Sequence, residues 1–253
     1  MDNNNLFDFY IENTKKNFTG WDFSELTDTD RMVSSPLSWS YFSEVSKYIC
    51  QNEVNTMLDM GTGGGEFLSK FIILPPNTYA TEGYEPNIPI ARKRLNPLGV
   101  KVVKVENNVL KFADNYFDLI INRHESYSVE EVKRVLKSDS FFITQQVGSE
   151  NCLGINRALG VKEDMGLGTW NLDFTKQQLK KNRFKLIKSF EEFPKLRFYD
   201  MGALIYYLKA VPWQVENFSV ESFKPKLKEI HEFIQSNNYF EVSEHRFFII
   251  AKK

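Results

Sequence analysis

The stretch LDMGTGGGEF, residues 58–67, places four glycines within five positions directly after a short apolar run. The whole chain of 253 residues contains only 13 glycines. Glycine loses more backbone freedom on folding than any other residue, so a cluster of glycines is costly in an ordered segment. The cluster therefore indicates a turn whose backbone must take a position that a side chain would prevent.

The composition is that of a globular chain without a strong charge bias. Apolar residues make up 42% of the sequence and charged residues 26%, which is typical of folded domains. The 32 basic and 33 acidic side chains leave no general positive field, which disfavours a nucleic-acid partner in the absence of a local basic patch. No segment approaches the roughly 18 apolar residues of a membrane span, and the polar N-terminal segment lacks the apolar core of a secretory signal. We therefore expect a cytoplasmic protein with no membrane partner.

The two cysteines, Cys50 and Cys152, lie far apart and belong to no CxxC pair or histidine cluster. Such isolated cysteines are ordinarily reduced thiols. We therefore expect neither a disulfide nor a metal site.

From residue 54 onward, short apolar segments alternate with segments of helical spacing. We expect strands at 55–60, 77–85, 99–106, 116–123, 140–147, 183–193 and 245–253, and helices at 66–72, 87–95 and 128–137. Alternating strands and helices are typical of a parallel sheet that is covered on both faces. The sequence therefore predicts an α/β protein with a doubly wound core.

Two helix starts follow from capping patterns. Ser128 with Glu131 has the spacing of a capping box, and Thr175 with Gln178 repeats it. We therefore expect one helix to begin at about residue 128 and another at about residue 175.

The glycine cluster follows the first predicted strand, where a parallel sheet brings ligands close to the backbone. A dinucleotide fingerprint would need a glycine where Glu66 stands, and the GK[ST] of a phosphate-binding loop is absent. The Glu66 carboxylate would also repel a phosphate at the start of the next helix. A ligand with a positive charge or a neutral ribose fits this turn better.

Taken in order, these segments resemble the class I S-adenosylmethionine-dependent methyltransferases. The first family motif is an acid followed by GxGxG, and LDMGTGGG matches it with Asp59 as the acid. The second strand ends in an acid, Glu82, and VENNVLKFADNYFDLII places Glu106 and Asn107 at the family's adenine-contacting position. EEVKRVLKSDSFFI then follows the family's EVxRVLKPGGxF layout, with KSDS in place of the KPGG turn. The resemblance covers roughly residues 55–147.

The resemblance implies a Rossmann-like, seven-stranded, mostly parallel sheet whose last strand is antiparallel, with S-adenosylmethionine as cofactor. It implies a set of cofactor-binding residues and no metal; the set is Asp59, Gly61, Thr62, Gly63, Gly65, Glu82, Gly83, Glu106, Asn107 and Asn122. Three alternatives remain open: Asp59 as a cap of the turn, Glu82 as a surface charge, and Glu85 in place of Glu82.

We expect four segments around this cofactor site. They are an N-terminal helical cap at 1–50, the cofactor-binding core at 51–196, an inserted helical lid at 197–240 and a final core strand at 241–253. The many aromatic side chains of the cap either anchor its helices to the core or line a substrate pocket.

Methyl transfer from a sulfonium is an in-line displacement, so much of the rate can come from holding the nucleophile against the methyl group. A general base is optional. His124, in the segment NRHES at the carboxyl end of the fourth predicted strand, is our candidate for it, and a wall of the pocket is its alternative role. Gln145 and Gln146 end the fifth predicted strand, and one of them either contacts substrate or satisfies backbone groups.

Methyl transfer to a small molecule is the function that the sequence favours. A methyltransferase acting on ribosomal or transfer RNA, a catalytically silent protein that binds the cofactor, and a nicotinamide oxidoreductase are the alternatives. Charge balance disfavours the RNA enzyme, and Glu66 disfavours the oxidoreductase. The sequence leaves the acceptor and the oligomeric state open.

Overall fold

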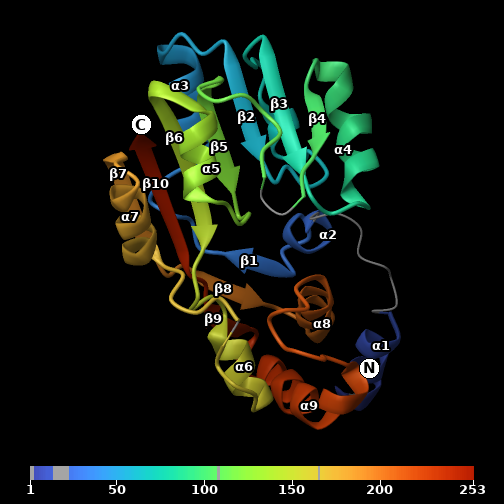
Figure 1. The fold of residues 1–253 in the computed structure, drawn as a ribbon. Helices are drawn as coiled ribbons and strands as arrows, with labels where there is room; N and C mark the ends of the chain where they lie inside the picture. The colour runs from blue at the N-terminus through green and yellow to red at the C-terminus, as the bar shows by residue number, and fades with distance from the viewer. Residues whose placement is uncertain (1–2, 14–22, 107–108, 165) are drawn as a thin grey trace. The chain divides into compact units, whose positions relative to one another are not determined.

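The computed structural model describes residues 3–13, 23–106, 109–164 and 166–253 (Figure 1). The chain forms two compact units. The sheet unit comprises Ser38–Val147, Trp170–Glu191 and Arg246–Lys253. The accessory unit comprises Met1–Leu37, Gly148–Thr169 and Glu192–His245. The chain therefore passes between the two units several times.

The sheet unit is built on a seven-stranded sheet with the strand order β4-β3-β2-β5-β6-β10-β7. Its strands are β2 (Thr56–Met60), β3 (Asn77–Glu82), β4 (Lys101–Lys104), β5 (Phe117–Arg123), β6 (Leu136–Val147), β7 (Lys185–Glu192) and β10 (Arg246–Lys252). The strands β4, β3, β2, β5 and β6 pair in parallel, and β10 pairs antiparallel to β6. The predicted Rossmann-like sheet with an antiparallel last strand is confirmed.

Helices cover both faces of this sheet (Figure 1). The helical segments of the unit are α3 (Tyr41–Gln51), α4 (Asn87–Leu95), α5 (Val129–Val135), α7 (Leu172–Lys181) and the short 3₁₀ turns Leu68–Lys70 and Asn96–Leu98. Apolar side chains of α5 and α7 pack on one face of the sheet, in a cluster with Leu58, Ile120 and Phe142. Tyr41 of α3 packs edge-on against Phe248 of β10. The core is thus doubly wound, as the sequence predicts.

The predicted helix at 66–72 is wrong, because only the 3₁₀ turn Leu68–Lys70 forms there. Pro75 and Pro76 stand directly before β3 and leave few residues in which a helix can run and return. The residue before a proline is also driven away from helical dihedrals. The glycine turn is therefore followed by a short connection instead of a full helix.

The two capping patterns had opposite outcomes. Ser128 is the N-cap of α5, and its side chain accepts a hydrogen bond from the Glu131 N–H, as predicted. The start predicted at Thr175 is wrong, because α7 begins three residues earlier with Asn171 as its N-cap. Thr175 is fully buried inside the helix. The Asn171 side chain, one turn before Thr175, caps the helix by accepting the Phe174 N–H.

The accessory unit mixes helices with a small antiparallel sheet in the order β1-β8-β9. Its elements are α1 (Asn3–Asn13), α2 (Ser24–Thr27), β1 (Met32–Ser34), α6 (Leu153–Leu159), β8 (Lys195–Phe198), α8 (Met201–Ala210), α9 (Val220–Asn237) and β9 (Phe240–Ser243). The sequence indicated helical additions only. Strands of three or four residues are too short to show an alternating pattern, which explains why they were missed.

The compact units divide the chain at other residues than the predicted boundaries. Helix α3 lies within the predicted N-terminal cap but belongs to the sheet unit, where the Tyr41 hydroxyl donates to the Asn122 carbonyl at 3.1 Å. Helix α6 lies within the predicted core but belongs to the accessory unit, where Ile155 is buried in its apolar cluster. The functional division into cap, core and lid stays a proposal.

The N-terminal aromatic side chains lie in different surroundings, and their role in a substrate pocket stays a prediction. Trp39 and Tyr41 are buried in the sheet unit. Phe9 and Tyr10 line a cavity of about 360 Å³ within the accessory unit, together with the Arg31–Asp200 ion pair. Phe18 and Trp21 lie outside the described residues. In the described part of the chain, no helix is both long enough and apolar enough to span a membrane.

We predict that Asn171→Ala lowers the free energy of unfolding by about 1 kcal/mol, because the Asn171 Oδ1 accepts the Phe174 N–H at 2.9 Å. Gln178→Ala is the matched control, since Gln178 would complete the capping box centred on Thr175. We expect it to change the free energy by less than about 0.5 kcal/mol. Urea unfolding measures both, and the reverse ranking would place the start of α7 at Thr175.

Candidate functional site

The glycine turn after β2 has a backbone that side chains disfavour. Gly61, Gly63 and Gly65 have φ angles of +68°, +62° and +82°. This left-handed region is open to glycine at no steric cost. The Thr62 N–H donates to the Thr81 carbonyl at 2.9 Å, which ties the turn to β3. The glycines therefore allow the turn to fold tightly over the carboxyl edge of the sheet.

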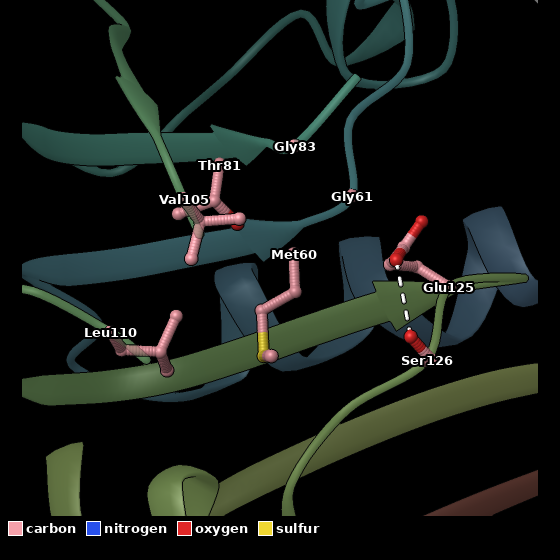
Figure 2. Close-up of a pocket in the computed structure, with 8 residues that line it drawn as sticks. All are labelled: Met60, Gly61, Thr81, Gly83, Val105, Leu110, Glu125 and Ser126. Atoms are coloured by element: carbon pink, nitrogen blue, oxygen red, sulfur yellow. Dashed lines mark hydrogen bonds between the residues drawn. The ribbon is translucent and has the colours of Figure 1, made fainter. Parts of the chain in front are cut away.

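A small cavity lies beside this turn, at the carboxyl ends of β2, β3 and β5 (Figure 2). It is lined by Met60, Gly61, Thr81, Gly83, Val105, Leu110, Glu125 and Ser126. Gly61 and Gly83 give it backbone walls, and Met60, Val105 and Leu110 give it an apolar side. Its volume is about 20 Å³, which is room for about one water molecule.

Glu82 is the acid that ends β3 at this edge. Its side chain is buried, and its Oε1 accepts the Tyr84 N–H at 2.7 Å. Burial raises its pKa, while hydrogen bonds from the backbone N–H groups of Tyr84, Gly63 and Gly83 oppose the rise. Glu85, its rival, is 75% exposed and paired with Lys104 at 2.5 Å. Of the two acids, Glu82 is the one positioned beside the turn.

Asp59 is buried near the end of β2. Burial raises the pKa of its carboxyl to about 7, although the Thr62 hydroxyl and the positive charge of Arg123 lower it. The Arg123 guanidinium lies 4.9 Å from the centre of the Phe67 ring. Asp59 therefore titrates in the neutral range instead of remaining a fixed anion.

Glu125 lies directly against the glycine turn. A Cβ built on Gly61 would come within 2.3 Å of the Glu125 Cγ, a distance that no real contact allows. Loss of hydration and the nearby charge of Glu82 raise the pKa of Glu125. Its side chain therefore fills space beside Gly61 that a larger ligand would need.

Glu66 does not act as an isolated negative charge at the turn. It forms an ion pair with Arg94, whose guanidinium also donates to the Gly64 carbonyl at 2.5 Å. The opposite charge of Arg94 offsets the carboxylate. Glu66 therefore repels a bound phosphate less strongly than the sequence alone predicts.

The structure brings only some of the predicted cofactor residues to the cavity. Gly61 and Gly83 line it. Glu106 is exposed and pairs with Lys104 at 3.2 Å, and Asn107 lies outside the described residues. The fully buried Asn122 accepts hydrogen bonds from the Thr144 hydroxyl at 3.1 Å and from the Gln146 amide, so its oxygen is used within the sheet.

His124 stands at the end of β5 with a left-handed backbone, φ +61°. Its backbone N–H donates to the Gln145 carbonyl at 2.8 Å, and its Nε2 lies 3.2 Å from the Gln145 amide nitrogen. The residue has exposed surface, but the protein atoms around it remove much of its hydration. This desolvation and the charges of Arg123 and Arg246 hold the pKa of His124 well below its usual value. The imidazole is therefore neutral at pH 7.

Sequence reasoning missed the apolar side of the cavity. Met60 precedes the first glycine, and Val105 and Leu110 flank the segment in which only the polar residues were considered. An apolar residue on each side of that segment was the available signal. Among the described residues, no group of three or more His, Cys, Asp or Glu side chains could hold a metal ion.

We predict that Asp59 makes the protein less stable as the pH rises. Its folded pKa of about 7 exceeds the unfolded value of 3.8, so the folded state holds more protons between these values. The free energy of unfolding should fall from about pH 4 to about pH 7, by at most ~1.4 kcal/mol per pH unit. In Asp59→Asn this contribution disappears, so its stability relative to the unchanged protein should increase over that range. Urea unfolding at several pH values measures both proteins. If their free energies of unfolding change with pH by the same amount, the pKa of Asp59 is not raised.

We compared the sequence with models of known protein families and with curated proteins. A family model described as a methyltransferase domain matches residues 58–144, which include the glycine turn, Glu82 and His124. No curated protein matches the chain significantly.

Many solved structures share the fold at low sequence identity. A Bacillus halodurans protein provisionally described as a methyltransferase is 17% identical with a TM-score of 0.58, covering 83% of this chain and 99% of its own. The YcgJ protein from Bacillus subtilis is 15% identical with a TM-score of 0.58, covering 84% and 97%. A protein of unknown function from Deinococcus radiodurans is 12% identical with a TM-score of 0.58, covering 87% and 90%. At these identities the structural neighbours establish the fold alone.

The domain match, the strand order and the glycine turn lead to one conclusion. Residues 58–144 match a methyltransferase domain, and they are carried on a Rossmann-like, mostly parallel seven-stranded sheet.

Proposed function

We propose that this enzyme binds S-adenosylmethionine at the turn after β2 and transfers its methyl group to a small-molecule acceptor. The observation that carries the proposal is the meeting of left-handed glycines and a buried carboxylate at one edge of the sheet. A parallel sheet binds nucleosides at this edge, because the strand ends and the turns that follow them converge there.

The residues present fit the parts of this cofactor. Gly61, Gly63 and Gly65 leave the backbone open to a close neighbour. The Glu82 carboxylate suits the two vicinal ribose hydroxyls, since an ionised carboxylate accepts hydrogen bonds on both oxygens. Met60 and Val105 offer apolar contact to a base. When bound, the cofactor supplies an electrophilic methyl group on a positively charged sulfur.

The acidic side chains beside the turn favour this charge. Asp59 and Glu82 are both buried, and they lie close enough to each other that the charge of Glu82 raises the pKa of Asp59. A nearby positive charge stabilises ionised carboxylates and relieves their mutual repulsion. The site is therefore better matched to a sulfonium nucleoside than to a pyrophosphate.

The acceptor is proposed to be a small molecule on the balance of charge. The formal net charge is −1 at pH 7, so the chain as a whole does not attract a polyanion. Incubation with a labelled methyl donor tests this, using fractionated metabolites and total RNA as separate acceptor pools. Label recovered in small molecules is expected, and label recovered only in RNA would overturn the assignment.

We predict that Glu82→Ala weakens binding of S-adenosylmethionine and of its demethylated product by about 10-fold to 100-fold, the usual cost of losing hydrogen bonds to a charged group. Glu85→Ala is the matched control, because Glu85 lies three residues away and is exposed. It should bind both ligands within about twofold of the unchanged protein. Calorimetric titration measures both variants, and equal losses in the two would remove Glu82 from the site.

We also predict that Glu125→Ala strengthens cofactor binding several-fold. The Glu125 side chain packs against Gly61 in a cavity of about 20 Å³, so it must turn away before a nucleoside enters. A ligand that must displace a side chain binds with an affinity lowered by that cost. Calorimetry again gives the answer, and weaker binding by the variant would identify Glu125 as a contact instead of an obstacle.

A further inference from the structure

Three side chains of the sheet unit form a hydrogen-bonded row that ends at His124. The Trp39 indole N–H donates to the Gln145 Oε1 at 2.8 Å. The other end of the same amide, Gln145 Nε2, lies 3.2 Å from the His124 Nε2. Trp39 precedes α3, Gln145 lies in β6 and His124 follows β5. The row is therefore held by separate elements of one unit.

The indole decides which way the Gln145 amide points. An indole N–H can only donate, so it must meet the amide oxygen and not the amide nitrogen. Trp39 is itself held, since it is 8% exposed and stacks on Phe190 and Phe248 with ring centroids 5.7 and 6.1 Å away. Gln145 is also buried, with 6% exposed. The amide nitrogen is therefore directed at His124.

The orientation of the amide in turn decides the tautomer of His124. An amide nitrogen donates and cannot accept, so the His124 Nε2 must be the acceptor. In a neutral imidazole the proton then resides on Nδ1. The backbone N–H of His124 donates to the carbonyl of the same Gln145 at 2.8 Å, which holds the residue in place. Among the described residues, none forms a hydrogen bond with Nδ1.

We propose that Trp39 and Gln145 are positioning residues that hold His124 as its Nδ1–H tautomer, so that His124 donates a hydrogen bond to the methyl acceptor instead of removing its proton. The accessible lone pair of the ring is occupied by Gln145, which leaves no free basic nitrogen. This inference rests on the proposed methyl transfer for its substrate but not for the tautomer.

The donor role selects a class of acceptor. A fixed N–H is satisfied by an oxygen acceptor, and the positive charges of Arg123 and Arg246 act on the same imidazole. The negative charge of Asp59 acts on Arg123 and raises its pKa, against the lowering by burial. The matching acceptor is a small molecule with an oxygen that is already ionised at neutral pH, such as a carboxylate. Such an acceptor arrives without a proton to be removed, so the transfer needs no base.

Nitrogen-15 NMR tests the tautomer without any substrate. The chain has only three histidines, His124, His231 and His245, so the ring signals are few, and His124→Asn identifies those of His124 by their loss. At neutral pH, long-range proton–nitrogen correlations should show His124 protonated on Nδ1. Protonation on Nε2 would overturn the proposal.

Two variants test the cause of the tautomer. Gln145→Glu replaces the donor by an acceptor, so the proton of His124 should move to Nε2 while Trp39 still donates to the carboxylate. Trp39→Phe removes the group that orients the amide, so both tautomers should become populated. If Gln145→Glu does not fold, Trp39→Phe decides alone. An Nδ1–H form that persists unchanged in the folded variants would exclude the row as its cause.

The substrate class has its own readout. Benzoate as a probe should shift the His124 Nδ1–H resonance, and benzylammonium of similar size should not; no shift with benzoate would refute the oxyanion site. With an acceptor found by the labelled-donor screen, His124→Asn should retain about tenfold more kcat/KM than His124→Gln, because asparagine places its N–H close to Nδ1 and tolerates a positive φ. Equal losses would argue against an Nδ1–H donor. Absence of any methyl transfer would count against the proposed function, and the NMR result on the tautomer would still stand.

Discussion

The left-handed backbone between β2 and the first 3₁₀ turn is the constraint on which the site depends. Only glycine at Gly61 and Gly65 allows the turn to lie as close to its neighbours as it does. A Cβ on Gly65 would meet the Leu95 side chain at 2.7 Å, and a Cβ on Gly61 would meet Glu125 at 2.3 Å. The same turn is bonded to β3 through Thr62 and Thr81. The glycines thus bring α4, β3 and the segment after β5 together around one edge of the sheet.

The second organising feature is the concentration of carboxylates near that edge. Burial alone would make charged Asp59 and Glu82 costly. The structure offsets this cost in different ways, through backbone N–H groups at Glu82 and through Thr62 and Arg123 at Asp59. Both pKa values remain above their ordinary range, so the site stays electrostatically strained. A cationic ligand would lower this electrostatic cost, which connects the energetics of the buried carboxyls to the charge of the proposed cofactor.

Much of the sheet could be predicted because its signals are local. Residues 116–121 are apolar or aromatic at every position except Asp118, and Ser128 with Glu131 forms a cap that needs no distant partner. The errors occurred where a local rule met a competing one. The prolines that precede β3 prevent the helix expected at 66–72. Asn171 caps α7 one turn before the cap expected at Thr175. The strands of the accessory unit were too short to leave a periodic pattern, and the pairing of β1 with β8 joins segments more than 150 residues apart.

The sequence by itself determined the glycine turn, the parallel strands that alternate with helices and the acids at positions 59 and 82, because each depends on neighbours within a few residues or on a recurring motif. Only the tertiary structure decided what those residues face. It separated Glu82 from Glu85 by burial, turned Asn122 into the sheet, placed Glu125 against Gly61 and joined Trp39 to His124 through Gln145. Such contacts unite residues up to 106 positions apart. They arise from the packing of whole elements, and no local pattern of residues encodes them.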